Sequence, residues 1–227
     1  MTRTATELLA TTTAALAPDP RANPLVPLIA RGEADRTTTL AALSLEQGWV
    51  IPADRRAFLH LALRAAPEAP ESAAFFTLLA EGEALAAERL GAFSQACGVD
   101  EARARTYEPL PGCQAYPAYV AWLALNASPA DVVLALAANF SAWGGYCATI
   151  AEALRTRYGF TDEACAFFDF FAEPSPELER RATDAVQAAL DAGHLDENLA
   201  HTYGRLLQSY ESTFWATLGQ RTETPTA

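Results

Sequence analysis

Helix-forming residues fill almost every segment of this chain, and runs of β-branched residues are nearly absent. No Asn-Gly or Asp-Gly pair flanked by alternating apolar residues indicates a β-hairpin. Serine–proline pairs instead mark helix starts. Ser128 and Ser175 are suited to cap a helix, and Pro129 and Pro176 then occupy the first helical positions. The sequence therefore predicts an all-α fold.

The periodicity predicts a series of helices over residues 3–16, 23–32, 36–51, 53–66, 70–97, 114–126, 129–158, 161–173, 176–192 and 195–218. Pro52 is expected to kink one long helix rather than end it. The longest expected connection covers residues 99–113. Because no repeat or composition break divides the chain, we expect one helical domain over 23–218, an N-terminal helix or arm over 1–22 and a disordered tail over 219–227.

The charge balance excludes several classes of function. All 16 basic residues are arginine, and 28 acidic residues give a formal net charge of -12. A nucleic-acid surface needs clustered basic residues to displace counterions, so we expect no nucleic-acid partner. Without lysine, the chain can form no Schiff base and can supply no phosphate-loop lysine.

Cysteine usage and hydropathy predict a cytoplasmic protein. The four cysteines form no CxxC pair, and free thiols suit a reducing compartment. The apolar run near the N-terminus is too weak for a secretory signal. The longest apolar stretch, 130–146, contains Asp131 and Asn139 and is interrupted by Gly144 and Gly145. We therefore expect a buried helix there and no membrane partner.

No pattern predicts a metal site or a cofactor. His194 and His201 lie seven residues apart, about 10 Å along a helix, which is too far for one ion. No Glu-x-x-His pair and no Gly-x-Ser-x-Gly occurs. Cys147 and Cys165 lack a neighbouring base or cation that would favour a thiolate, and a buried apolar role is the simpler interpretation.

Aromatic and acidic residues stand in places that an ordinary core would not use. Glu211 is surrounded by the bulkiest apolar residues of the last helix, and a carboxyl on an inward face has a raised pKa that suits proton transfer. Glu46 is a second candidate acid. For both, the competing interpretation is a solvated helix face. Tyr116, Trp143 and Tyr146 add rings that could line a pocket.

Four stretches together resemble the TenA (thiaminase II) family, which belongs with PqqC to the haem-oxygenase-like helical fold. They are Tyr210–Leu218 (YESTFWATL), Leu45–Trp49 (LEQGW), Gln114–Tyr119 (QAYPAY) and Phe168–Ala172 (FDFFA). The resemblance covers about residues 23–218 and implies a haem-oxygenase-like bundle, a pocket for a planar heterocycle and a homo-oligomer.

The resemblance also implies roles for individual residues. Glu211 matches the family's late glutamate, which moves protons, and Glu46 matches its early acid, which grips an aminopyrimidine. Trp49, Tyr116 and Phe171 match pocket positions of the family, and with Trp143 and Tyr146 from the mixed run 139–147 they are expected to line the pocket wall. The family's nucleophilic cysteine falls near 141–143, where this chain has Ser-Ala-Trp.

Three functions remain open from the sequence. The first is binding of a thiamine-pyrimidine type heterocycle, with hydrolysis by acid–base chemistry led by Glu211 and without the family cysteine. The second is a non-catalytic ligand-binding or regulatory protein on the same scaffold. The third is a metal-dependent oxidase with ligands such as Glu83 or Asp54.

Overall fold

The computed structural model describes residues 3–18 and 23–220, and this part of the chain is helical without strands. The predicted all-α fold is therefore confirmed. Its helices are α1 (Ala5–Ala15), α2 (Leu25–Arg31), α3 (Ala41–Ala65), α4 (Pro70–Ala96), α5 (Glu101–Thr106), α6 (Pro111–Asn126), α7 (Pro129–Ala137), α8 (Phe140–Thr156), α9 (Asp162–Ala172), α10 (Pro176–Ala192) and α11 (Glu197–Gly219), with a π-helical turn over Arg36–Leu40. Most of the tail expected at 219–227 lies outside the described residues.

Local signals set most helix ends. Ser175 accepts a hydrogen bond from the Leu178 amide and caps α10, whose other end is closed by Gly193 in the left-handed conformation (φ 68°). Ser128 stands at the corresponding cap position of α7, but its side chain accepts no cap hydrogen bond. Helix α3 continues through Pro52, as predicted.

Two predicted boundaries are wrong. The helix expected over 129–158 is two helices, because the chain turns at Ala138 and Asn139 between α7 and α8. There the Asn139 side-chain amide donates to the Ala135 carbonyl at 2.7 Å, and such local bonds compete with a regular helix. The connection expected over 99–113 contains α5, which Asp100 caps by accepting from the Arg103 amide at 2.7 Å.

The segment Pro129–Thr156 is long and apolar enough to cross a membrane by length and composition alone, a test that core helices of soluble proteins also pass. Its first part, α7, is almost wholly buried and packs against α10 and α11. Within this bundle, α7 is therefore a core helix.

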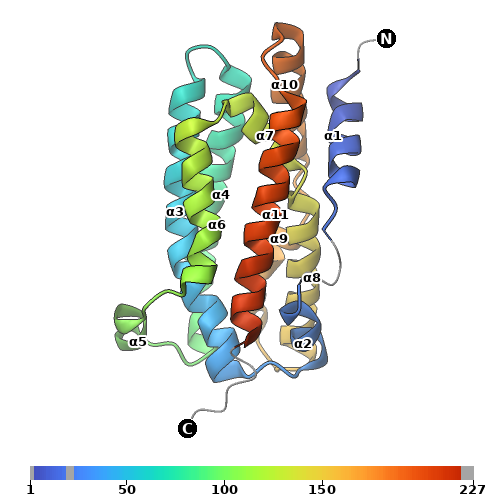
Figure 1. Cartoon of the computed structure of the whole chain (residues 1–227). Helices are drawn as coiled ribbons and strands as arrows, with labels where there is room; N and C mark the ends of the chain where they lie inside the picture. Colours follow the sequence, from blue (N-terminus) through green and yellow to red (C-terminus); the bar gives the residue numbers. More distant parts are fainter. Residues whose placement is uncertain (1–2, 19–22, 221–227) are drawn as a thin grey trace.

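The long helices run roughly along one common direction, with α3, α4 and α6 grouped together and α11 beside α6 (Figure 1). Two apolar clusters fill the interior. One gathers around Phe93, Phe168 and Trp215, and the other around Phe75 and Phe76. The side chain of Tyr116 packs against both clusters, so α6 joins the two halves of the core.

Helix α8 approaches α9 closely at one of its two adjacent glycines. A Cβ placed on Gly144 would lie 3.1 Å from the Phe171 carbonyl oxygen, which is closer than ordinary van der Waals contact. A Cβ on Gly145 would meet no heavy atom within 4 Å. Gly144 thus allows the approach of α9, whereas Gly145 makes no such contact.

We expect opposite changes in stability from the two alanine substitutions. Gly145→Ala should raise the free energy of unfolding by about 0.5–1 kcal/mol, because alanine loses less backbone entropy in a helix. Gly144→Ala should leave the free energy of unfolding unchanged or lower it, because the added Cβ forces the Phe171 backbone of α9 to move away. Urea denaturation of both variants measures the difference, and equal stabilisation by the two would contradict the close approach of α8 and α9.

Candidate functional site

Glu211 lies inside the bundle, one helical turn before Trp215 on α11. The Trp215 indole Nε1 donates to Glu211 Oε1 at 3.1 Å. Burial raises the pKa of Glu211 above its usual value, and the hydrogen bond from Trp215 partly offsets this rise. Glu211 is therefore a partly exposed acid whose carboxyl faces the aromatic residues of the bundle interior.

Two of the predicted wall residues contact Trp215, and a third lies behind one of them. Its ring centroid lies 5.9 Å from that of Trp143 and 5.8 Å from that of Tyr146. Trp143 in turn meets the ring of Phe171, on α9, edge to face at 5.5 Å. Side chains from α8, α9 and α11 thus form one aromatic group beside the Glu211 carboxyl.

Tyr116 brings α6 to the same region. Burial raises the pKa of its phenol well above the usual value, and the negative charges of Asp54, Glu211 and Glu83 raise it further. The phenol of Tyr116 is therefore within electrostatic reach of three acidic side chains. Together these four groups form an acidic region in which Asp54 is buried and the other three side chains are partly exposed.

Asp54 and Glu83 were considered in the sequence only as possible metal ligands. Burial raises the pKa of Asp54 to about 8, and burial together with the charge of Asp54 raises that of Glu83 well above its usual value. Asp54 Oδ1 has no hydrogen-bond partner. The sequence contained a signal for a buried acid at this position, because Asp54 interrupts the apolar stripe that Ile51 and Phe58 form on α3.

The acidic side chains do not combine into a metal centre. Among the described residues, no group of three or more His, Cys, Asp or Glu is arranged to hold a metal ion. The charge of Asp54 acts on Glu83, and a proton on either carboxyl relieves the repulsion between the two groups.

Cys147 lies close enough to Glu211 for the charge of that acid to act on its thiol. Burial raises the pKa of its thiol well above the usual value, and the charge of Glu211 raises it further. Because the thiolate is the nucleophilic form, this environment disfavours attack by Cys147.

Glu46 occupies a different environment from Glu211. Its fully buried carboxylate accepts hydrogen bonds from the Tyr107 hydroxyl at 2.5 Å, the Leu110 amide at 2.7 Å and the Gln114 side-chain amide at 2.7 Å. Both oxygens are thus engaged in holding the segment that joins α5 to α6. The acids whose charge raises the pKa of Tyr116 are Asp54, Glu211 and Glu83, and Glu46 is not one of them.

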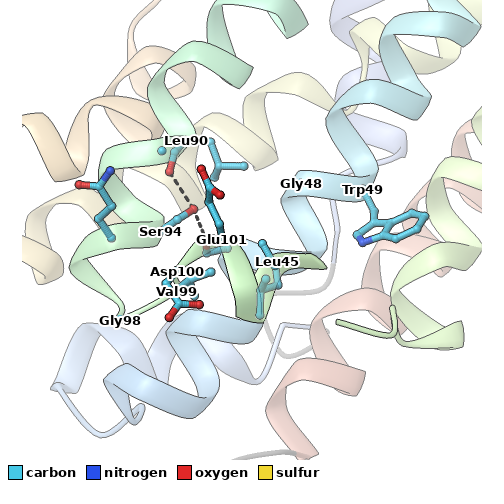
Figure 2. Close-up of a pocket in the computed structure, with 13 residues that line it drawn as sticks. Leu45, Gly48, Trp49, Leu90, Ser94, Gly98, Val99, Asp100 and Glu101 are labelled. Carbon is cyan, nitrogen blue, oxygen red and sulfur yellow. Dashed lines mark hydrogen bonds between the residues drawn. The ribbon is translucent and has the colours of Figure 1, made fainter. Parts of the chain in front are cut away.

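Trp49 also lies apart from the aromatic group around Trp215. It is 50% exposed and stands at the edge of a surface groove of about 700 Å³ between α3, α4 and α5. In Figure 2 its indole points away from the side of the groove that Ser94 and Glu101 line. A second hollow, of about 10 Å³, is lined by Glu211, Tyr146 and Trp215 among other residues.

The two hollows differ in chemistry as well as size. The groove is within the usual size range of small-molecule sites, but its titratable lining residues, Asp100 and Glu101, are exposed. The smaller cavity has room for about one water molecule, yet it borders a buried acid and two aromatic rings. Perturbed acids and convergent rings favour the smaller cavity as the candidate site.

Removing the Glu46 carboxylate should destabilise the fold strongly. Glu46→Ala leaves the Tyr107, Leu110 and Gln114 donors without their acceptor, and we expect a loss of about 3 kcal/mol or more in the free energy of unfolding. Urea denaturation measures the loss. Glu88→Ala, on the exposed face of α4, serves as the control and should change stability by less than about 0.5 kcal/mol.

The stability of the fold should fall as pH rises from about 4 to about 8. Within this range the folded chain keeps a proton on Asp54 (pKa about 8), whereas the unfolded chain, with its ordinary value of 3.8, releases it. The folded state therefore binds more protons, and the free energy of unfolding decreases with pH by up to about 1.4 kcal/mol per unit.

Asp54→Asn should flatten this dependence and should be more stable than the unmodified chain at pH 8. Glu81→Gln, which removes one exposed charge from α4, should leave the slope in place. Urea titrations at several pH values test both variants. An unchanged slope in Asp54→Asn would show that Asp54 is ionised in the folded chain.

Comparisons with known proteins identify the fold of this chain. No family model matches the sequence, and no curated protein matches it. A solved domain of unknown function with a heme oxygenase-like fold, from Shewanella denitrificans OS217, is similar with a TM-score of 0.70 and 14% identity, over 95% of this chain and 90% of that one. A TenA homologue from P. horikoshii OT3 is similar with a TM-score of 0.67 and 14% identity, over 96% and 99%. The chain therefore has the haem-oxygenase-like, all-helical fold that TenA proteins share, as the resemblance implied.

Proposed function

We propose that this chain binds a small planar heterocycle of the aminopyrimidine type beside Glu211 and hydrolyses an exocyclic carbon–nitrogen bond with Glu211 as the proton-transfer group. The observation that carries the proposal is the Glu211 carboxyl, which accepts a hydrogen bond from Trp215, a residue whose ring packs against those of Trp143 and Tyr146. Rings above and beside a carboxyl suit a flat ligand that carries hydrogen-bond donors.

The charge of the buried region favours a ligand that carries a basic nitrogen. No arginine lowers the pKa of Asp54, Glu83 or Glu211, so these acids have no cationic partner among the residues that the structure describes. A protonated ring nitrogen or amine would supply the missing positive charge and would stabilise the ionised acids. A neutral hydrocarbon ring would gain no such interaction.

Binding requires the cavity to enlarge, because about 10 Å³ is much less than a heterocycle occupies. The side chains that would move are those of Trp143, Tyr146 and Phe171, which are only partly buried. Glu83, Tyr116 and Glu211 also retain partial exposure despite their strongly desolvated polar groups. These partly exposed side chains support a pocket that opens around the ligand.

The proposed reaction is the hydrolysis of an aminomethylpyrimidine. Water forms the new carbon–oxygen bond at the methylene carbon, the carbon–nitrogen bond breaks, and ammonia leaves. Glu211, whose pKa burial raises above its usual value, donates a proton to the departing amine and then accepts one from the attacking water. The high pKa of the Cys147 thiol favours this route over covalent catalysis.

The test measures binding and turnover separately. We expect 4-amino-5-aminomethyl-2-methylpyrimidine to raise the melting temperature of the protein and to be converted with release of ammonia. Glu211→Gln should lower kcat by about 100-fold or more while the probe still binds, because only proton transfer is lost. Cys147→Ala should keep kcat within about threefold, since general acid–base catalysis does not use the thiol.

The outcomes separate the candidate functions. Binding without ammonia release by the unmodified protein would identify a non-catalytic binding protein. Phe171, which has no hydroxyl where the family resemblance places a tyrosine, and the protonated Cys147 favour that second function. Absence of any thermal shift with the probe would overturn the proposal, and loss of activity in Cys147→Ala would replace acid–base catalysis by a covalent route.

A further inference from the structure

Two buried amide donors without a partner line the small hollow beside Glu211. Within residues 3–18 and 23–220, Asn23 Nδ2 and Gln208 Nε2 are the buried side-chain amide nitrogens that form no hydrogen bond. Both residues line the hollow of about 10 Å³, together with Glu211. Because a buried donor left unpaired is costly, two of them in one place indicate a site where an acceptor belongs.

The surrounding structure fixes the direction of the Asn23 donor. Asn23 is 3% exposed, and its Oδ1 accepts from the Leu25 amide at 3.2 Å and from the Val26 amide at 3.1 Å, in the first turn of α2. Only the oxygen of a side-chain amide can accept these two bonds, so Nδ2 is held on the side that faces away from them. The Asn23 amide is therefore held as a donor in one orientation.

Gln208 and Tyr146 belong to the wall of the hollow next to Glu211. Gln208 and Glu211 lie three residues apart on α11 and so share one side of that helix. Burial and the charge of Glu211 raise the pKa of the Tyr146 phenol. The nearby Asn23 side chain offsets part of this rise, although its Nδ2 is not in hydrogen-bond geometry with the hydroxyl. The hollow thus presents two unpaired donors and one carboxyl within a small volume.

We infer that the hollow is an oxygen subsite, in which Asn23 and Gln208 donate to a ring carbonyl of the ligand. This inference rests on the proposed function, which places the ligand beside Glu211, and it narrows the ligand to an oxo-substituted aminopyrimidine. A carbonyl oxygen has two lone pairs and can accept from both amides, whereas a ring nitrogen has one. A volume of about 10 Å³ holds one water-sized group, which suits a single oxygen atom.

Charge and position define this oxygen more closely. Glu211 would repel a carboxylate or a phosphate, and no arginine is among the described residues that line the hollow, so the acceptor is a neutral oxygen. In the proposed reaction Glu211 also protonates the departing amine, so the carbonyl and the aminomethyl group stand on neighbouring ring atoms. The proposed opening of the pocket moves aromatic side chains of α8 and α9, and Asn23 and Gln208 keep their places.

Two probes that differ at one ring position test the inference by titration calorimetry. They are 2-amino-5-aminomethylpyrimidin-4-one and 2,4-diamino-5-aminomethylpyrimidine, which place an oxygen acceptor and an amine donor, respectively, beside the aminomethyl carbon. We expect the ratio of their dissociation constants, amine probe over oxo probe, to fall about tenfold or more in Gln208→Met, which lacks the donor. Asn23→Asp keeps the acceptor for the α2 amides and should lower the ratio as well, because its carboxylate accepts from the ring amine.

The matched control is Gln95→Met, which makes the same exchange at an exposed position in the separate surface groove and should leave the ratio unchanged. Because variants are compared by a ratio, the difference in basicity between the two rings cancels, and thermal melting confirms that each variant is folded. An unchanged ratio in Gln208→Met or Asn23→Asp would overturn the inference and leave the proposed function standing. So would failure of the oxo probe to bind where 4-amino-5-aminomethyl-2-methylpyrimidine binds. Absence of binding by all three compounds would overturn both.

Discussion

The stability of this apolar bundle depends on how its inward-facing carboxyl groups are compensated, since none has a cationic partner among the described residues. Taking an acid out of water is costly unless hydrogen bonds or protonation compensate. Glu46 is compensated by three donors from the segment before and within α6. Glu211 receives one donor, Trp215, and Asp54 and Glu83 shift toward the protonated form. The Glu46 carboxyl thus stabilises the fold, whereas the carboxyls of Glu211, Asp54 and Glu83 keep the capacity to exchange a proton.

The difference between these acids explains where the candidate site lies. Glu46 has no free oxygen to offer a ligand, whereas the Asp54 Oδ1 atom has no partner. Trp215 links the Glu211 carboxyl to rings from α8 and α9, and Tyr116 brings the second apolar cluster to the same place. Residues far apart in the chain therefore meet where the two halves of the core join.

Much of the fold was predictable from the sequence, because it is encoded locally. Ser175 and Pro176 start α10, Gly193 closes it, and α3 passes through Pro52 as the pattern indicated. The break between α7 and α8 was not predictable, since it depends on one asparagine side chain bonding to the preceding turn. Glu211 and Phe171 were expected at the pocket from the resemblance, and Trp143 and Tyr146 from the mixed residues around them. The environments of Glu46 and Asp54 were not, because periodicity shows that a residue faces inward but not which donors it meets there.

The placement of the cysteines has a practical consequence for work on this protein. All four are buried, and burial raises the pKa of Cys97 to about 12 and those of Cys147 and Cys165 above their ordinary value. Alkylating reagents attack exposed thiolates, so the native bundle should resist them until a helix pair separates. The rate of thiol labelling then reports how often the interior opens, cysteine by cysteine, without any probe having to be engineered into the chain.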